Sequence, residues 1–143
     1  MQGVIFALGE FGIGYSSLTY LRRLSVNLIK IDQSLCNMLN DADDLSILRG
    51  GIALAKSIKC DVIAEGVDKI EHGTALIKFD CESTQGYGIA RPMPASEVLE
   101  RGCHWKPSVS WQTQIKKSKT ARVLQIIILI HNDYITELMV ITR

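Results

Sequence analysis

Strand-like and helix-like stretches alternate along the first 100 residues, and this alternation is the strongest constraint on the fold. Short apolar runs at 3–8, 26–32, 60–67 and within 83–94 are typical of buried strands. Segments with apolar residues three or four positions apart, at 16–24, 43–58 and 69–79, are typical of amphipathic helices. Four such units imply parallel strands joined by crossover helices, so we predict an α/β fold.

Polar side chains stand at or just after the end of each predicted strand. Ligands of parallel sheets bind beyond the carboxyl ends of the strands, so these positions define a candidate site. The residues are Glu10, Lys30, Asp32, Glu65, Asp68 and Gln85. Carboxylates can hold divalent cations and a lysine can neutralise developing charge, so phosphodiester hydrolysis is the reaction that fits this set.

Some of these positions also have a purely structural interpretation. Glu10 alone is typical of a solvated loop, and Lys30 could lie on an outward edge, although a lysine within an apolar run is costly unless it is paired or faces a polar cleft. Gly86, beside Gln85, can simply mark a bulge. The glycine-spaced "GEFGIGYSS" lacks the ending of a phosphate-binding loop. The functional interpretation therefore depends on the recurrence of polar residues once per unit.

The charge balance changes sign near residue 101. Residues 1–100 hold 9 Lys/Arg and 13 Asp/Glu, whereas residues 101–143 hold 7 and 2. We therefore predict a first domain over 1–103 and a basic tail of uncertain structure over 104–143. The "KKSK" run is more typical of a solvated surface than of a nucleic-acid site, and nearby Trp105 and Trp111 can simply be packing residues.

The four cysteines show no paired spacing that would indicate a zinc site or a disulfide framework. They are Cys36, Cys60, Cys81 and Cys103, and we expect reduced, mostly buried thiols. No secretion signal is evident, and the apolar run at 123–130 is far shorter than the roughly 20 residues of a membrane span. We therefore expect a cytoplasmic protein without a membrane span.

Three motifs, in this order, resemble the second half of the EAL domain: "ALGEFGIGYSSLTYLRRLSVNLIKID", "VIAEGVD" and "QGYGIARPMP". This bacterial family of cyclic di-GMP phosphodiesterases is named for a Glu-Ala-Leu motif near its start. The resemblance covers about residues 3–100. It implies a modified TIM barrel, of which this chain holds about four βα units, with two Mg²⁺ or Mn²⁺ ions at the carboxyl ends of the strands.

The resemblance implies a role for each matching residue. Lys30 corresponds to the family's catalytic lysine and Asp32 to its companion acid. Glu65 corresponds to a glutamate that serves the metal ions and the attacking water. Asp68 replaces a glutamate that steadies a loop over the site, and Gln85 corresponds to a glutamine beside the substrate.

The chain departs from the family at the first of these motifs. Gly9 and Glu10 stand where the family has two adjacent metal-binding aspartates, so the first ligand, which typically bridges the metals, is absent. Glu10 keeps a metal-binding carboxylate, one methylene further out. The family's Glu-Ala-Leu motif, an asparagine and another glutamate also supply ligands, and the chain begins after them.

We therefore expect a truncated EAL-domain protein that does not hydrolyse cyclic di-GMP on its own. One alternative is an active phosphodiesterase completed by another chain. The other is a protein-interaction module of cyclic di-GMP signalling. A partial barrel leaves sheet edges open, so we expect the tail, a second copy in a homo-oligomer, or another EAL or cyclase protein to cover them, and no nucleic-acid partner.

Overall fold

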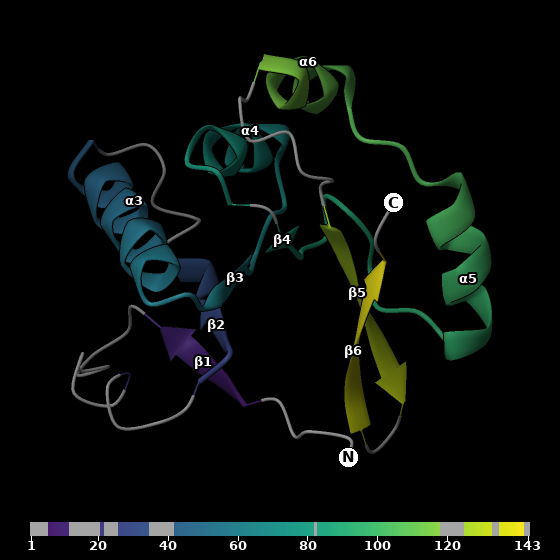
Figure 1. The fold of residues 1–143 in the computed structure, drawn as a ribbon. Coiled ribbons are helices and arrows are strands. Elements are labelled where there is room, and N and C mark those ends of the chain that lie inside the picture. The colour runs from purple at the N-terminus through teal and green to yellow at the C-terminus, as the bar shows by residue number, and fades with distance from the viewer. Residues whose placement is uncertain are drawn as a thin grey trace. The chain divides into compact units, whose positions relative to one another are not determined.

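The computed structural model describes residues 6–11, 21, 26–34, 42–81, 83–117, 125–132 and 135–141. The chain divides into two compact units, Met1–Gly66 and Val67–Arg143, and each is considered by itself. The first contains β1 (Ala7–Phe11), β2 (Leu28–Ile31), α3 (Ala42–Ser57) and β3 (Asp61–Ala64) (Figure 1). The second contains α4 (Ile70–Lys78), β4 (Ser83–Thr84), α5 (Ala95–His104), α6 (Val109–Lys117), β5 (Gln125–Asn132) and β6 (Ile135–Ile141).

The first unit is built on a parallel sheet in the order β1-β2-β3. The β2–β3 register is unbroken from Leu28 opposite Asp61 to Ile31 opposite Ala64. Ile29 and Ile31 are almost fully buried, as are Ile63 and Ala64. The buried residues of α3, which contacts β3, are Leu48, Ile52 and Ala55, three or four positions apart as the sequence predicts. The predicted α/β class is confirmed, whereas the helix predicted at 16–24 lies almost entirely outside the described residues.

β1 continues further than the sequence predicts. An end at residue 8 was expected, but the strand runs through Gly9 and Glu10 to the buried Phe11. Leu8 lies opposite Ile29 and Phe11 opposite Ile31, so two residues of β1 face one of β2. This β-bulge places Glu10 in the left-handed region, with φ of 55°. Burial of Phe11 explains why pairing resumes beyond the glycine.

The second unit includes an antiparallel addition from the tail. β4 pairs in parallel with β5, and β5 pairs antiparallel with β6. Ser83 lies opposite Gln125 and Thr84 opposite Ile126. The tail thus supplies a strand that covers the edge of β4. This agrees with the expectation that the tail covers an open sheet edge. The domain boundary at residue 103 stays a prediction.

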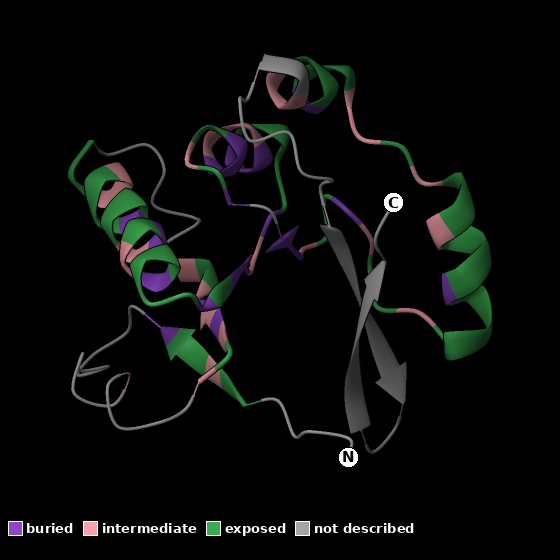
Figure 2. Cartoon of the chain, in the orientation of Figure 1, coloured by how far each residue is buried: buried purple, intermediate pink, exposed green. Residues whose placement is uncertain are grey.

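Two tryptophans attach the linker and α6 to the rest of the second unit. The Trp111 indole lies against Gly73 of α4, where an added Cβ would overlap the ring. Its Nε1–H donates to the Ile70 carbonyl at 2.7 Å, and the Trp105 Nε1–H donates to the Ile89 carbonyl at 3.1 Å. Trp111 is only 3% exposed, and Figure 2 shows buried positions on α4. Both tryptophans are packing residues, as the sequence indicates.

The thiols follow the expected pattern in part. Cys60 and Cys81 are buried, whereas Cys103 on α5 is exposed, and none of the three forms a disulfide with another described residue. Cys36 lies outside the described residues. Burial, followed by the nearby Asp61 charge, raises the pKa of the Cys60 thiol. Within the described part of the chain, no helix has both the length and the apolar character needed to span a membrane.

A substitution at Gly66 tests the backbone geometry next to Glu65. The φ of Gly66 is +72°, and an added Cβ would crowd Gln33, whose Cα would lie 3.0 Å away. We expect Gly66→Ala to lower the free energy of unfolding by about 1 kcal/mol or more, measured by urea denaturation. Gly50→Ala in α3 is the matched control, because a Cβ there meets nothing within 4 Å, and it should stabilise by about 0.5–1 kcal/mol. Equal stability of Gly66→Ala and the parent would contradict this account.

A substitution at Gly73 tests the packing of α6 against α4. Alanine has a helix propensity about 1 kcal/mol better than glycine, so Gly73→Ala would stabilise an isolated α4. In this structure the methyl group overlaps the Trp111 ring. We therefore expect a net loss of stability of about 1–3 kcal/mol and faster proteolysis between α5 and α6. A net gain in stability would show that Trp111 does not occupy this position.

Candidate functional site

An ion pair between Lys30 and Glu65 is the centre of the candidate site in the first unit. Lys30 lies near the end of β2, and Glu65 directly follows β3, where its N–H donates to the Ile31 carbonyl at 3.0 Å. Because β2 and β3 are parallel neighbours, the two side chains reach each other, and Lys30 Nζ pairs with Glu65 Oε1. Their side chains are 26% and 20% exposed, so the charges are partly desolvated and compensate each other.

Asp32, the next residue after β2, organises the turn that follows. Its N–H donates to the Phe11 carbonyl at 3.3 Å, and its Oδ1 accepts the Ser34 N–H at 2.7 Å. Hydrogen bonds from Ser34, first from the side chain and then from the backbone, lower the pKa of the Asp32 carboxyl. The anionic form of Asp32 is therefore favoured by hydrogen bonds from the turn that follows β2.

Glu10 lies in the bulge that faces Lys30 in the β1–β2 register. The Glu10 residue is exposed, and the adjacent Gly9 has open space where a side chain would begin. A bulge re-aims the side chains beside it, so the carboxylate position is set by an unusual backbone rather than by regular pairing. A left-handed conformation costs a residue with a Cβ on the order of 1–2 kcal/mol.

The described residues do not fit a dinuclear metal centre. Among them, no group of three or more His, Cys, Asp and Glu side chains is placed to hold a metal ion. Gly9 contributes no ligand atom, and Glu65 is engaged by Lys30. Two hard divalent cations require many oxygen ligands at about 2.0–2.6 Å, and this part of the chain does not gather them.

The other two predicted site residues, Asp68 and Gln85, belong to the second unit. Asp68 Oδ1 accepts the Tyr87 N–H at 2.9 Å, and the Val67 N–H donates to the Gln85 carbonyl at 3.0 Å. An added Cβ on Gly86 would overlap the Val67 backbone, so the two segments are packed too closely for any side chain there. The Gln85 side chain is buried, at 6% exposed. Asp68 thus holds the loop that begins at Gln85.

The structure therefore gathers the predicted site residues in two sets. Glu10, Lys30, Asp32 and Glu65 lie in the first unit, where the ion pair unites two of them. Asp68 and Gln85 lie in the second unit. Their segments are connected by the hydrogen bond from Val67 to Gln85 and by the one from Tyr87 to Asp68. Convergence of all six on one cleft stays a prediction.

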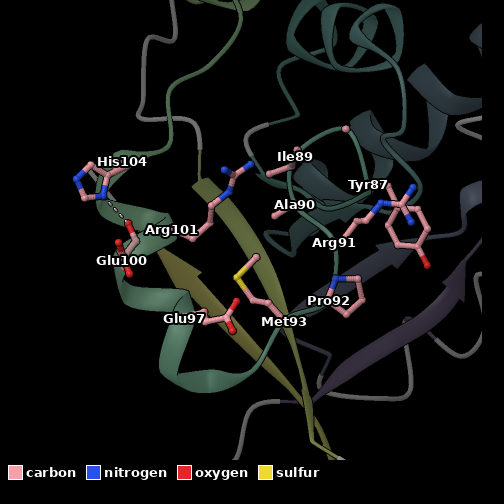
Figure 3. A pocket seen from close by; sticks show the side chains of 11 residues that line it. Tyr87, Ile89, Ala90, Arg91, Pro92, Met93, Glu97, Glu100, Arg101 and His104 are labelled. Carbon is pink, nitrogen blue, oxygen red and sulfur yellow. Dashed lines mark hydrogen bonds between the residues drawn. The ribbon is translucent and has the colours of Figure 1, made fainter.

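A cavity of about 800 Å³ in the second unit was not predicted from the sequence. It lies between the loop Tyr87–Met93 and α5, with Glu97, Glu100, Arg101 and His104 along the helix (Figure 3). The Arg91 guanidinium lies 4.7 Å from the centroid of the Tyr87 ring. The amphipathic spacing after Pro94 predicts a helix at the position of α5, but it does not predict that this helix borders a cavity.

Comparison with known proteins shows which family this sequence matches. The family model described as "EAL domain" matches residues 1–92. The bifunctional diguanylate cyclase/cyclic di-GMP phosphodiesterase MucR of Pseudomonas aeruginosa is 40% identical over 99 residues, which is 68% of this chain and 14% of MucR. Cyclic di-GMP phosphodiesterase NbdA of the same species is 37% identical over 99 residues, 68% of this chain and 13% of NbdA. The chain thus spans about one seventh of these relatives.

Solved structures agree with the sequence comparison. The chain matches the MucR phosphodiesterase in complex with c-di-GMP with a TM-score of 0.64 and 40% identity, over 68% of this chain and 40% of that one. It matches the EAL domain of Mycobacterium smegmatis DcpA with a TM-score of 0.68 and 34% identity, over 73% and 48%. Klebsiella pneumoniae BlrP1, in a manganese and cyclic di-GMP complex, matches with a TM-score of 0.56 and 28% identity, over 59% and 22%.

The lowered pKa of Asp32 predicts a pH dependence of stability. The folded-state pKa lies below the unfolded value of about 3.9, so the carboxylate stabilises the fold above that pH and the contribution is lost as the pH falls through the folded pKa. In urea denaturation below about pH 4, the parent should lose stability more steeply than Asp32→Asn, which cannot titrate. Ser34→Ala should reduce the difference without removing it. Parallel pH profiles for all three proteins would refute this assignment.

Proposed function

The chain belongs to the EAL domain family, and we propose that it is a fragment derived from cyclic di-GMP phosphodiesterases that does not hydrolyse cyclic di-GMP on its own. The observation that carries the proposal is the Lys30–Glu65 ion pair, which preserves two charged groups at the matching motif positions. The described residues around it lack a group of metal ligands. A charge pair of this kind can position a phosphodiester but lacks the means to complete its hydrolysis.

The chemistry explains why the pair alone is insufficient. Lys30 Nζ is a cation that would stabilise negative charge developing on a phosphoryl oxygen, and Glu65 is a base within reach of the same region. In this structure Glu65 is held by Lys30, so each group offsets the other's charge. Loss of one well-placed transition-state contact commonly costs about 10²–10³ in rate, and the described residues gather no group of metal ligands around the pair.

A second candidate function is an active phosphodiesterase completed by another chain. Within the first unit, β1 pairs with β2 on one side, and residues 6–11, 26–34 and 42–66 provide no strand on its other side. Such an edge offers backbone N–H and C=O groups to an incoming strand. The match covers 40% of the solved MucR chain, so completion by another chain would require a segment that corresponds to other parts of that structure.

The proposal is tested by incubating the purified chain with cyclic di-GMP and Mg²⁺ or Mn²⁺ and measuring the linear dinucleotide. We expect no turnover above that of Lys30→Ala, because the metal ligands are incomplete. Lys78→Ala, at an exposed position in the last turn of α4, is the matched control for loss of a lysine. Circular dichroism establishes that both variants are folded.

Clear turnover by the chain alone, abolished by Lys30→Ala and kept by Lys78→Ala, would overturn the proposal. Mixing with the complementary segment of the MucR EAL domain separates the two candidates. Turnover that appears only on mixing and depends on Lys30 favours completion by another chain. Tight binding to that segment without turnover favours the interaction module.

A further inference from the structure

A second, smaller hollow lies where the linker between α5 and α6 passes the second unit. Its volume is about 370 Å³. We call it the basic hollow and define it by six of its lining residues: Arg101, His104, Trp105, Lys106, Ser108 and Trp111. Three of these carry basic groups, and none of the residues that line it is acidic. The acidic residues Glu97 and Glu100 line the larger neighbouring cavity instead.

The charges in the basic hollow are not neutralised by the described part of the chain. Neither Arg101 nor Lys106 forms an ion pair with a described residue, and both are exposed. His104 Nδ1 lies 2.9 Å from the Glu100 carbonyl. Because a carbonyl oxygen only accepts, Nδ1 carries the proton in this contact, and Nε2 is the nitrogen directed elsewhere. Two cationic groups without carboxylate partners favour an anion at this position.

The wall of the basic hollow is fixed by the packing of the two tryptophans. Trp111 donates to the Ile70 carbonyl and Trp105 to the Ile89 carbonyl, so both indole N–H groups are satisfied by backbone. Their ring centroids are 6.3 Å apart. Trp111 is buried, whereas the Trp105 ring is half-buried and borders the hollow. These contacts hold Lys106 and Ser108 beside Arg101 rather than leaving them on a free linker.

The neighbouring cavity gives a ligand room beyond its anionic group. The two hollows share Arg101, His104 and the Gly88–Ile89 segment. Figure 3 shows Arg101 extending from α5 toward Ile89, and both residues line the two hollows. Volumes of this size suit small-molecule ligands, and aromatic walls favour planar rings. Glu97 and Glu100 disfavour a second anionic group in the larger cavity, so an uncharged ring and sugar fit there better.

We propose that the basic hollow binds the phosphate of a nucleoside monophosphate, with the base and sugar extending past Arg101 and His104 into the larger cavity. Arg101 and Lys106 supply the charge, and Ser108 supplies a hydroxyl donor. All six residues that define the hollow lie between 101 and 111, beyond the residues 1–92 that the EAL domain model matches. The site is independent of Lys30 and Glu65, so it does not rest on phosphodiester hydrolysis.

Tryptophan fluorescence gives a direct readout, because Trp105 and Trp111 are the only two tryptophans in the sequence. We expect 5′-GMP to cause a saturable change below about 1 mM, and inorganic phosphate to compete with it. Arg101→Ala and Lys106→Ala should each weaken binding about tenfold, since each removes a charge-assisted contact. Arg49→Ala, on the exposed surface of α3 in the first unit, is the matched control and should bind like the parent. Added salt should weaken binding of the parent.

Three outcomes would overturn the proposal. The first is the absence of a saturable change with 5′-GMP. The second is equal binding of guanosine, which lacks the phosphate. The third is unchanged binding by the double variant Arg101→Ala/Lys106→Ala, provided that its ligand-free emission spectrum matches that of the parent and so shows an intact tryptophan contact.

Discussion

Parallel pairing of β2 with β3 fixes the position of the charged residues in the first unit. The buried side chains of Ile29, Ile31 and Ile63 hold the two strands in one register. Buried and half-buried positions alternate in β2, so a shift by one residue would move Lys30 to a buried position. That register alone brings Lys30 within reach of Glu65. The ion pair is thus a consequence of apolar burial, and the charges themselves contribute little net stability.

The second unit depends on a different kind of contact. A glycine in α4 leaves a gap that the Trp111 ring fills, and hydrogen bonds from both indoles connect the chain beyond α5 to backbone carbonyls. The family-like segment and the basic tail therefore share one packed region, although their charge balance differs. The same contacts place Arg101 and Lys106, which form no ion pair with a described residue, beside a hollow. The packing of the tryptophans thus creates both a docked helix and a candidate ligand site.

The sequence predicts those features that depend on local periodicity. The helix expected at 43–58 is observed at Ala42–Ser57, and the strand within 26–32 is Leu28–Ile31. A lysine inside an apolar run predicts a polar partner, and Glu65 is that partner. The bulge at Glu10 was missed because burial of Phe11 overrides the glycine as a stop signal. The basic hollow was missed because Trp111 and Gly73 are distant in sequence, and no local pattern reports such a contact.

The pairing of β5 with both neighbours has a consequence for how the second unit folds. β5 and β6 are separated by two residues in the sequence, so their antiparallel pairing is local and can form on the microsecond scale. Pairing of β4 with β5 instead joins Ser83 to Gln125 and requires closure of a long loop, which is slow. During synthesis β4 emerges from the ribosome well before β5. Until β5 has been synthesised, the backbone groups of β4 that pair with it are therefore accessible to other chains or to chaperones.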